Sequence, residues 1–385
     1  MTNWPVFSAR EMEAVQAVLQ SGKVNYWTGD QGKHFEQEFA EYCAAPFAIA
    51  AANGTVTLDM ALRALRVGPG DEVIVTPRSY FASASAIALL GARPVFADVD
   101  LDSQNMTAET IAPALSERTR AILVVHLAGW PSDMRAIMEL ADSHGVAVIE
   151  DCAQAHGARI DGQHVGTFGS FGSFSFCQDK IMTTGGEGGM LITMNEELFE
   201  FVRSFKDHGK NFEKMGPRPG QYGFRYVHDG LGTNYRMTEM QSAIGREQLR
   251  LLDDWLATRT RNAMRWASIL SEASALRIPL PDADRVRHAF YKFYAFVDPE
   301  ALRHEWSRDR LVSELNDEGV RVFTGSCPEI YREVAFADAP EQRRLPSARA
   351  LGETSLMLLV DPTIDEFSIE DNARKIVRKL KVAQR

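Results

Sequence analysis

One lysine, Lys180, has the sequence surroundings of a reactive amine. Residues 171–190 read FGSFSFCQDKIMTTGGEGGM, in which alternating apolar residues indicate a strand and the later glycines indicate a tight turn. A lysine has an ordinary pKa near about 10.4, so partial burial or a positive neighbour must lower that pKa to give a free amine at neutral pH. Such an amine can attack an aldehyde and form a Schiff base. Lys180 alone is also compatible with a solvated surface residue.

A carboxylate upstream, Asp151, supplies a second reactive group. It ends the apolar run VAVIED at 146–151, which is typical of a buried strand. The C-terminal edge of an open α/β sheet is where ligands bind, although Asp151 alone could be only a helix N-cap. Pyridoxal 5'-phosphate (PLP) needs a lysine for its aldehyde and a carboxylate for its pyridinium nitrogen. We therefore predict that Lys180 and Asp151 are catalytic residues of a PLP site.

A phosphate site is predicted at Asn53-Gly54-Thr55. These residues follow the apolar stretch 47–51 and open an amphipathic helix with Leu58, Leu62 and Leu65 on one face. Glycine allows close approach of the backbone to an anion, and the free N–H groups of a helix start attract it. An ordinary capped helix after a tight turn is the alternative.

With these motifs in place, the chain resembles the DegT/StrS family of PLP-dependent sugar aminotransferases, of fold type I (aspartate aminotransferase-like). The similarity is carried, in order, by NGTVTLDMALRAL at 53–65, GDEVIVTP at 70–77, GARPVFADVD at 91–100, EDCAQAHGA at 150–158, SFSFCQDKIMTTGGEGG at 173–189 and GTNYRMTEMQSAIG at 232–245. The resemblance implies an α/β fold with a mostly parallel central sheet and a smaller C-terminal α+β domain.

The resemblance also implies a role for each matching residue. Lys180 would form the Schiff base and move the proton between substrate and cofactor, and Asp151 would keep the pyridine nitrogen protonated. The other cofactor contacts would be Phe81 on the ring face, Gln154 beside the ring and its phenolic oxygen, and Gly54, Thr55 and Ser175 at the phosphate. Asn234 would reach the phosphate of the neighbouring subunit, which implies a homodimer with shared active sites.

The substrate contacts are harder to predict. The candidates are Tyr26, Trp27, Tyr80, His126 and Arg236. The aromatic side chains could stack on a base or on a sugar, but Tyr26 and Trp27 could instead be packing anchors. His126 ends an expected strand and could line the site, or it could be a core histidine.

The function that the resemblance implies is amino transfer from an amino acid, L-glutamate by analogy, to a keto sugar in amino-sugar or polysaccharide biosynthesis. The family's commonest acceptor is a nucleotide-linked 4-keto sugar. A keto-cyclitol of the scyllo-inosose type and an amino-benzoate-type synthase are alternatives. A dehydratase that uses pyridoxamine phosphate would lack the lysine, which is intact. A non-catalytic regulator would have lost Lys180, Asp151 or Thr55, and all three are present.

Composition indicates a globular enzyme. The 385 residues are 45% apolar and 24% charged, and the net charge of −10 argues against nucleic acid or an anionic membrane as partner. The four scattered cysteines predict neither a disulfide framework nor a metal site. No signal peptide or long apolar span is recognisable, so we expect a cytoplasmic protein.

The chain is expected to form two domains, a large PLP-binding domain at 1–255 with an N-terminal helix and loop, and a small C-terminal domain at 256–385. Strands of the large domain are predicted at 73–76, 93–97, 121–126, 146–150, 172–176 and 189–193. Helices should begin at the capping boxes Ser8–Glu11 and Thr238–Gln241, the second continuing to about Leu270. The small domain should contain strands at 291–297 and 320–323 and helices at 310–318 and 369–380.

A stretch without periodicity, residues 208–235, separates the predicted sheet from the long helix. It is rich in glycine, proline and basic residues, and loops of that length are often functional. Its basic residues and the one that follows are Lys210, Lys214, Arg218, Arg225 and Arg236. They could bind a phosphate or carboxylate of the substrate, or they could belong to a solvated loop.

Overall fold

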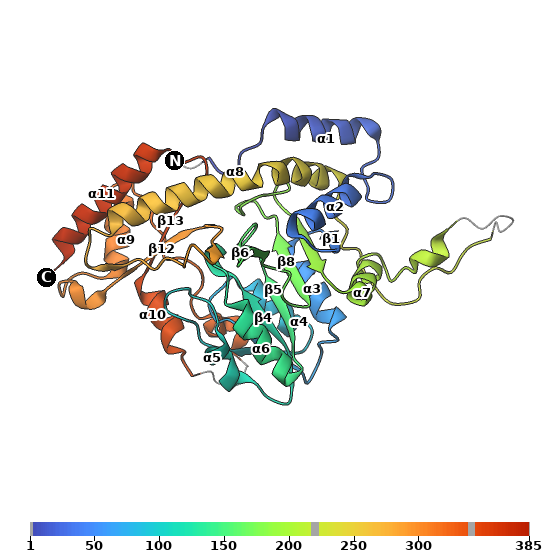
Figure 1. The fold of residues 1–385 in the computed structure, drawn as a ribbon, viewed down its shortest axis with the longest axis horizontal. Helices are drawn as coiled ribbons and strands as arrows, with labels where there is room; N and C mark the ends of the chain where they lie inside the picture. Colours follow the sequence, from blue (N-terminus) through green and yellow to red (C-terminus); the bar gives the residue numbers. More distant parts are fainter. Residues whose placement is uncertain (1–2, 217–222, 338–342, 385) are drawn as a thin grey trace.

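The computed structural model describes residues 3–216, 223–337 and 343–384. A seven-stranded sheet lies at its centre, in the order β1-β9-β8-β5-β4-β2-β3 (Figure 1). Its strands are β1 (Phe47–Ala51), β2 (Glu72–Val75), β3 (Arg93–Phe96), β4 (Thr119–Val125), β5 (Ala147–Asp151), β8 (Phe171–Ser175) and β9 (Gly189–Thr193). Only β9 runs antiparallel to its neighbours, which confirms a mostly parallel sheet and places the C-terminal ends of the other strands at one edge.

The helices of this region are α1 (Ala9–Ser21), α2 (Gln31–Cys43), α3 (Gly54–Ala64), α4 (Ala82–Leu89), α5 (Ala108–Ile111), α6 (Met134–His144) and α7 (Glu196–Lys206). The expected capping box of Ser8 and Glu11 is present at the start of α1. Gly22 ends α1 at a φ of 68°, a left-handed conformation that glycine adopts without strain.

A long helix, α8 (Glu239–Leu270), joins the two ends of the molecule, and the capping box of Thr238 and Gln241 begins it as predicted. Figure 1 shows α1 and α2 against one end of α8 and α11 against the other. The expected domain boundary at residue 255 therefore lies within a continuous helix, and we propose that α8 belongs to both domains.

The C-terminal region has its own antiparallel sheet, β10-β12-β13, and its own apolar core. Its elements are β10 (Leu276–Arg277), β12 (Phe293–Val297), α9 (Arg308–Asp317), α10 (Pro346–Thr354), β13 (Ser355–Leu358) and α11 (Glu366–Ala383). The strand expected at 320–323 is wrong, because Phe323 alone forms a bridge, to Met357.

Short elements complete the described chain. A small antiparallel sheet contains β6 (Arg159–Ile160), β7 (Gln163–His164) and β11 (Val286–Arg287). The 3₁₀ helices are η1 (Ala112–Ala114), η2 (Leu127–Gly129), η3 (Phe212–Met215), η4 (Pro299–Ala301), η5 (Ile330–Arg332) and η6 (Val334–Phe336). Within the described residues, none of the helices is long and apolar enough to span a membrane.

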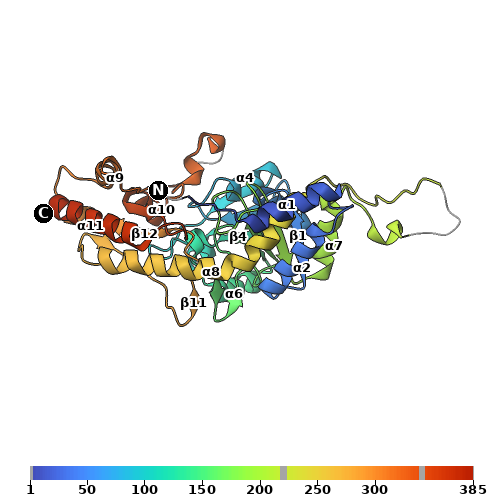
Figure 2. The ribbon, with the colours of Figure 1, turned by 90° about the horizontal axis from the view of Figure 1, so that it is seen from above.

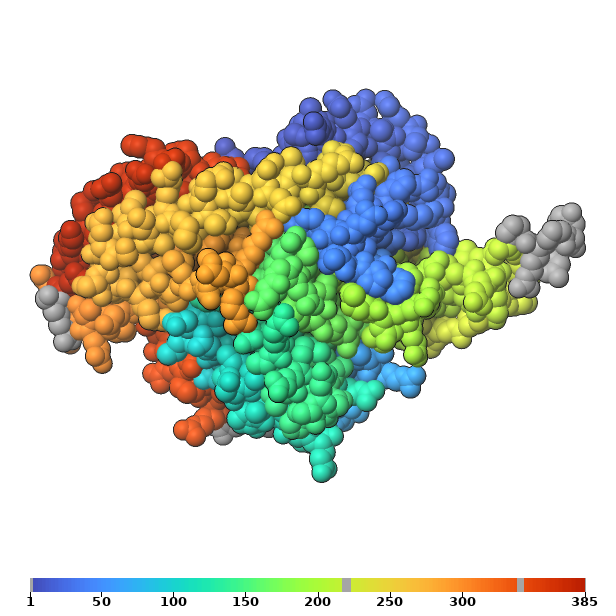
Figure 3. Space-filling view, in the orientation of Figure 1, coloured from blue at the N-terminus to red at the C-terminus, as the bar shows by residue number. Residues whose placement is uncertain are grey.

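The segment after α7 leaves the body of the molecule as an extended arm, which we define as the described residues 208–216 and 223–235. Figures 2 and 3 show it projecting at the end opposite α9 and α11. Three large apolar side chains on it, Phe224, Tyr226 and Leu231, are 83%, 87% and 97% exposed. Burying such side chains is favourable, so the arm has the composition of a contact surface.

Candidate active site

Asp151 and Lys180 meet at the C-terminal edge of the central sheet. Asp151 is the last residue of β5 and pairs in register with Ser173 of the parallel strand β8. Lys180 follows β8 on a turn closed by its backbone N–H and the carbonyl oxygen of Cys177, 3.1 Å apart. The two side chains are close enough for the lysine charge to lower the pKa of the Asp151 carboxyl. The structure therefore brings together the two predicted catalytic groups.

Asp151 is a buried carboxylate that lacks a cationic partner. Only 6% of it is exposed, and its oxygens accept hydrogen bonds from Ser83 Oγ at 2.9 Å and from the backbone N–H of Ala153 at 3.1 Å. Burial raises the pKa of Asp151, whereas the two hydrogen bonds and the charge of Lys180 lower it. The effect of burial is larger, so the pKa lies above its ordinary value. It forms no ion pair among the described residues, so a pyridinium N–H at this place would satisfy it.

The turn that carries Lys180 is held from several directions. Trp4 Nε1 donates to the carbonyl oxygen of Lys180 at 2.8 Å. The Lys180 Nζ atom lies 5.2 Å from the ring centroid of Tyr291, whose hydroxyl donates to Asp179. Within the described chain Nζ makes no hydrogen bond, so the backbone is fixed while the amine stays available to an aldehyde.

The start of α3, where the phosphate site is predicted, packs against β8. Asn53 caps the helix by accepting from the N–H groups of Thr55 and Val56, both at 3.0 Å. A Cβ on Gly54 would lie 2.6 Å from the Ser175 Cβ, so only glycine permits this contact. The helix start and Ser175 therefore share one edge with Asp151, and the positive end of the helix suits an anion.

Gln154 and Phe81 are each close in sequence to Asp151 or to its hydrogen-bond donor. Gln154 is buried, and its Oε1 accepts from the backbone N–H of Ala128 at 2.8 Å, which fixes the orientation of the amide. Phe81 precedes α4 and is two residues from Ser83, the donor to Asp151. This placement leaves both residues as proposed cofactor contacts.

The expectation that His126 faces a substrate is contradicted. The side chain is fully buried after β4. Its Nδ1 accepts from the backbone N–H of Ser132 at 3.0 Å, so Nε2 carries the proton and donates to Glu150 at 3.1 Å. Glu150 also accepts three backbone N–H bonds from Gly166, Phe168 and Gly169. His126 is therefore a core histidine that supports the sheet edge.

Tyr26 is a packing anchor in this structure. Its hydroxyl donates to Glu36 at 2.8 Å, and the buried Lys206 ammonium lies 4.3 Å from its ring centroid. Burial and the Glu36 charge raise the Tyr26 pKa far above its ordinary value. The hydroxyl is thus engaged within the chain, unlike the expectation of a substrate contact.

Trp27 packs at the base of the arm, stacked on Phe212 at 5.9 Å. Its Nε1 is buried and has no hydrogen-bond partner among the described residues. Tyr80, by contrast, is 72% exposed next to Phe81, and it stays a candidate substrate contact.

The described basic residues of the arm, and Arg236 directly after it, are largely paired within the chain. Lys210 and Arg236 both bond to Asp207, and Lys214 bonds to Asp229. Arg225 donates to a backbone carbonyl, and Arg218 lies outside the described residues. Asn234 is exposed at the base of the arm, and its Oδ1 accepts from the backbone N–H of Arg236 at 3.3 Å.

Comparison with known proteins agrees with this geometry. Residues 5–381 match the model of the DegT/DnrJ/EryC1/StrS aminotransferase family. The chain belongs to this family. A solved aminotransferase from Psychrobacter cryohalolentis is 48% identical, with 99% of each chain covered and a TM-score of 0.96.

Two curated relatives differ in the substrate that their names give. The dTDP-3-amino-3,4,6-trideoxy-alpha-D-glucose transaminase of Streptomyces venezuelae is 36% identical over 91% of this chain and 87% of its own. The L-glutamine:2-deoxy-scyllo-inosose aminotransferase of Streptomyces lividus is 39% identical over 97% and 88%. The protein is a PLP-dependent aminotransferase, and its acceptor is not fixed by family membership.

Several residues of the site could not be found from the sequence. Ser83 bonds to Asp151, Trp4 bonds to the Lys180 carbonyl, and Tyr291 lies beside the lysine amine. The position of Ser83 two residues after Phe81 is a weak signal. Trp4 and Tyr291 are more than 100 residues from Lys180 in sequence, and no local pattern connects them to it.

Proposed function

We propose that the protein transfers an amino group from L-glutamate to a nucleotide-linked 4-keto sugar in amino-sugar biosynthesis. The observation that carries the proposal is the buried, cation-free Asp151 beside the half-buried amine of Lys180 at one sheet edge. Family membership supports the reaction, and the relative whose name gives a dTDP-linked 3-amino sugar supports a nucleotide-linked acceptor, although not the position of its keto group.

The chain's own residues would divide the work as follows. When bound, PLP supplies the aldehyde and the electron-accepting ring. Asp151 would hold the proton on the pyridine nitrogen, and Gly54, Thr55 and Ser175 would bind the phosphate. Lys180 Nζ would take the proton from the substrate carbon that bears nitrogen and return it in the reverse half, as a general base and acid. Phe81 and Gln154 would orient the ring.

We also propose a homodimer in which Asn234 completes the partner's site. The exposed apolar side chains of the arm and the exposure of Asn234 support this assembly. The cysteines are free, and a reducing cytoplasm is the proposed compartment.

The two half-reactions test the proposal separately. The purified holoenzyme is mixed with L-glutamate or L-glutamine, and loss of the PLP absorption band identifies the donor. The aminated form then receives nucleotide-linked 4-keto sugars or keto-cyclitols, and return of the band identifies the acceptor. Return with a nucleotide 4-keto sugar supports the proposal. Return with scyllo-inosose-type compounds alone would assign the cyclitol alternative, which the relative from Streptomyces lividus favours.

A further inference from the structure

A second lysine lies next to the reactive one. Lys292 precedes β12, and its Nζ lies 4.6 Å from the ring centroid of Tyr291. The Lys180 Nζ lies 5.2 Å from the same centroid. Both amines therefore lie against one aromatic ring.

The Lys292 ammonium has no direct anionic partner. It forms no hydrogen bond or ion pair with any residue of the described chain, although the side chain is largely removed from solvent. The Oδ2 atom of its acidic neighbour Asp179 is occupied by the Tyr291 hydroxyl. An ammonium that has lost water without gaining a bonded partner is costly, so an incoming carboxylate would be bound favourably.

The charges around Lys292 come from four elements. They are Asp179 and Lys180 on the turn after β8, Arg259 on α8, Asp361 after β13, and the neighbouring Tyr291. Burial, with Arg259 and Lys180, lowers the pKa of Lys292 to about 8, although the two aspartates oppose this shift. The amine is therefore largely charged at neutral pH and loses its charge in mildly alkaline solution.

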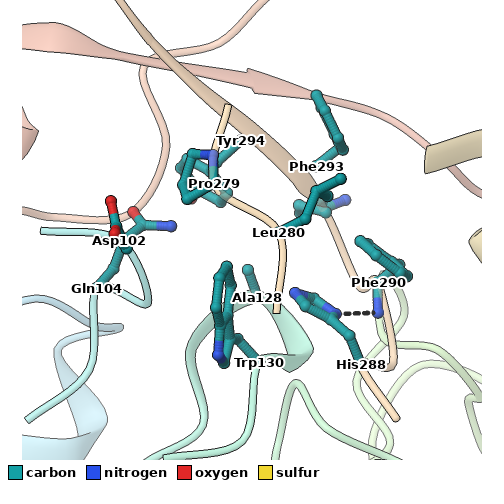
Figure 4. Close-up of a pocket in the computed structure, with 11 residues that line it drawn as sticks. Asp102, Gln104, Ala128, Trp130, Pro279, Leu280, His288, Phe290, Phe293 and Tyr294 are labelled. Atoms are coloured by element: carbon teal, nitrogen blue, oxygen red, sulfur yellow. Dashed lines mark hydrogen bonds between the residues drawn. The ribbon is translucent and has the colours of Figure 1, made fainter. Parts of the chain in front are cut away.

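Lys292 also contributes to the wall of a hollow between the two domains. This hollow is small, with a volume of about 20 Å³, and Figure 4 shows Trp130, His288 and Phe290 along it. Among the described residues that line it, Lys292 is the only lysine or arginine, and the one carboxylate, that of Asp102, is paired with Arg277. Burial lowers the pKa of His288 to about 3, and its Nδ1 accepts from the backbone N–H of Phe290, so this ring is neutral. The positive charge at this wall comes from Lys292.

We propose that Lys292 binds a carboxylate of the amino-acid donor. The inference rests on the proposed function, because it assumes an α-amino acid at Lys180. In such a donor every carboxylate belongs to the same small molecule as the amine, so a cation against the same ring as Lys180 can meet one of them. A diphosphate of the acceptor has the same charge chemistry, but it is separated from the reacting carbon by the sugar ring.

Binding of glutarate, an unreactive dicarboxylate, to the holoenzyme tests the proposal by calorimetry. Lys292→Met should weaken glutarate binding by roughly 10- to 100-fold, since a charged hydrogen bond is lost. Lys292→Arg should retain most of it. Lys23→Met, which alters an exposed lysine on the loop after α1, is the matched control and should bind as the wild type does. An unchanged PLP absorption band and melting temperature in each variant show that the site is intact.

The pH dependence gives a second readout. Wild-type affinity for glutarate should fall as the pH rises through about 8, because Lys292 loses its proton there. The Lys292→Arg variant should lack this fall, since arginine stays charged. Wild-type affinity for glutarate in the Lys292→Met variant would overturn the proposal.

Half-reactions distinguish the two anions. Lys292→Met should raise the L-glutamate concentration needed for half-maximal rate and leave the concentration dependence of the acceptor half unchanged. An effect on the acceptor half alone would overturn the proposal in favour of a diphosphate site. If no keto sugar is accepted but glutarate behaves as expected, the proposed acceptor fails while the role of Lys292 stands.

Discussion

The sheet edge at Asp151 and the base of the arm at Asn234 differ in how completely one chain satisfies them. At the sheet edge, both oxygens of Asp151 accept hydrogen bonds, and Trp4 and Cys177 hold the backbone of Lys180. At the base of the arm, three buried polar atoms have no partner among the described residues. They are Trp27 Nε1, Asp207 Oδ2 and Arg236 Nε. Asp151 and the Lys180 backbone are thus preorganised for a cofactor, although both ring nitrogens of nearby His156 lack a partner among the described residues. The base of the arm has unfilled hydrogen-bonding capacity.

The contrast extends to apolar surface. The aromatic residues beside the sheet edge, such as Phe174 and Phe176, are buried, whereas Phe224 and Tyr226 on the arm are exposed. Exposed aromatic side chains on the arm and unpaired polar atoms at its base are typical of a surface that a second molecule covers. The lysine and carboxylate half of the site is therefore built within one chain, whereas the arm half is proposed to need two.

The largest effect is expected at Lys180, because its replacement should abolish nearly all turnover. Lys180→Ala removes the only amine that the structure places beside Asp151 on this turn. Turnover should fall by more than about 10³-fold, because both covalent binding and proton transfer are lost. The cofactor should still bind, since Asp151 and the start of α3 remain. Borohydride treatment of the wild type should attach the cofactor to the peptide that contains Lys180. Attachment to a different lysine would refute the assignment.

A smaller loss is expected at Asp151. Asp151→Asn removes a charged hydrogen bond of about 1.5–3 kcal/mol to the ring nitrogen, and it also weakens the ring as an electron acceptor. Turnover should therefore fall more than cofactor affinity does, as measured by steady-state kinetics and by titration with PLP. Unchanged turnover would mean that Asp151 does not face the ring.

Asp151→Asn should lower the turnover of the holoenzyme, but it should not lower the folding stability of the cofactor-free protein. Burial raises the Asp151 pKa, so the folded state resists ionisation of this group. Its contribution to stability is complete below the pKa of the unfolded state and is lost as the pH rises through the raised pKa of the folded state. Asp151→Asn should thus remove this loss and make the cofactor-free protein at least as stable as the wild type at neutral pH. Denaturant unfolding measures the difference.

The two regions also differ in how well they could be predicted from sequence. Short apolar runs and adjacent turn residues predict where β5 and β8 end and where α3 begins. These are local signals in the sequence. The roles of Tyr26 and His126 depend on Glu36 and Glu150, and nothing local specifies which partner a buried polar side chain will meet. Burial decided these positions, and burial depends on the packing of distant elements.

A complementation experiment tests whether the arm completes the partner's site. Lys180→Ala and Asn234→Leu variants, each inactive or strongly impaired alone, are mixed under conditions that allow subunits to exchange. If sites are composite, one site of each mixed dimer carries both changes and the other is intact. Activity should then return toward half of the wild-type value per mixed dimer. If each subunit supplies its own asparagine, both sites stay damaged and nothing returns. A monomer on a sizing column would refute shared sites at once.

The smallest expected effect concerns the bond from Trp4 to the Lys180 carbonyl. Asn3 bonds to Thr363 of the C-terminal region, and the Trp4 ring packs edge-on against Trp255 of α8 at 4.9 Å. The N-terminal segment thus connects the C-terminal region to the reactive turn. Trp4→Phe keeps an aromatic ring and removes the N–H, so the free energy of unfolding should fall by about 0.5–1.5 kcal/mol. The kcat should fall a few-fold with little change in KM, because the amine loses orientation while substrate contacts remain.

A matched variant separates this positioning role from a loss of stability. Trp266 Nε1 also donates to a backbone carbonyl, that of Leu359 at 3.1 Å, but within the core of the C-terminal region. Trp266→Phe should therefore reduce stability to a similar extent and leave kcat unchanged. If Trp4→Phe also leaves kcat unchanged, Trp4 only fastens the N-terminus. If kcat falls equally in both variants, the loss reflects general destabilisation, and the sheet edge does not depend on Trp4 for its preorganisation.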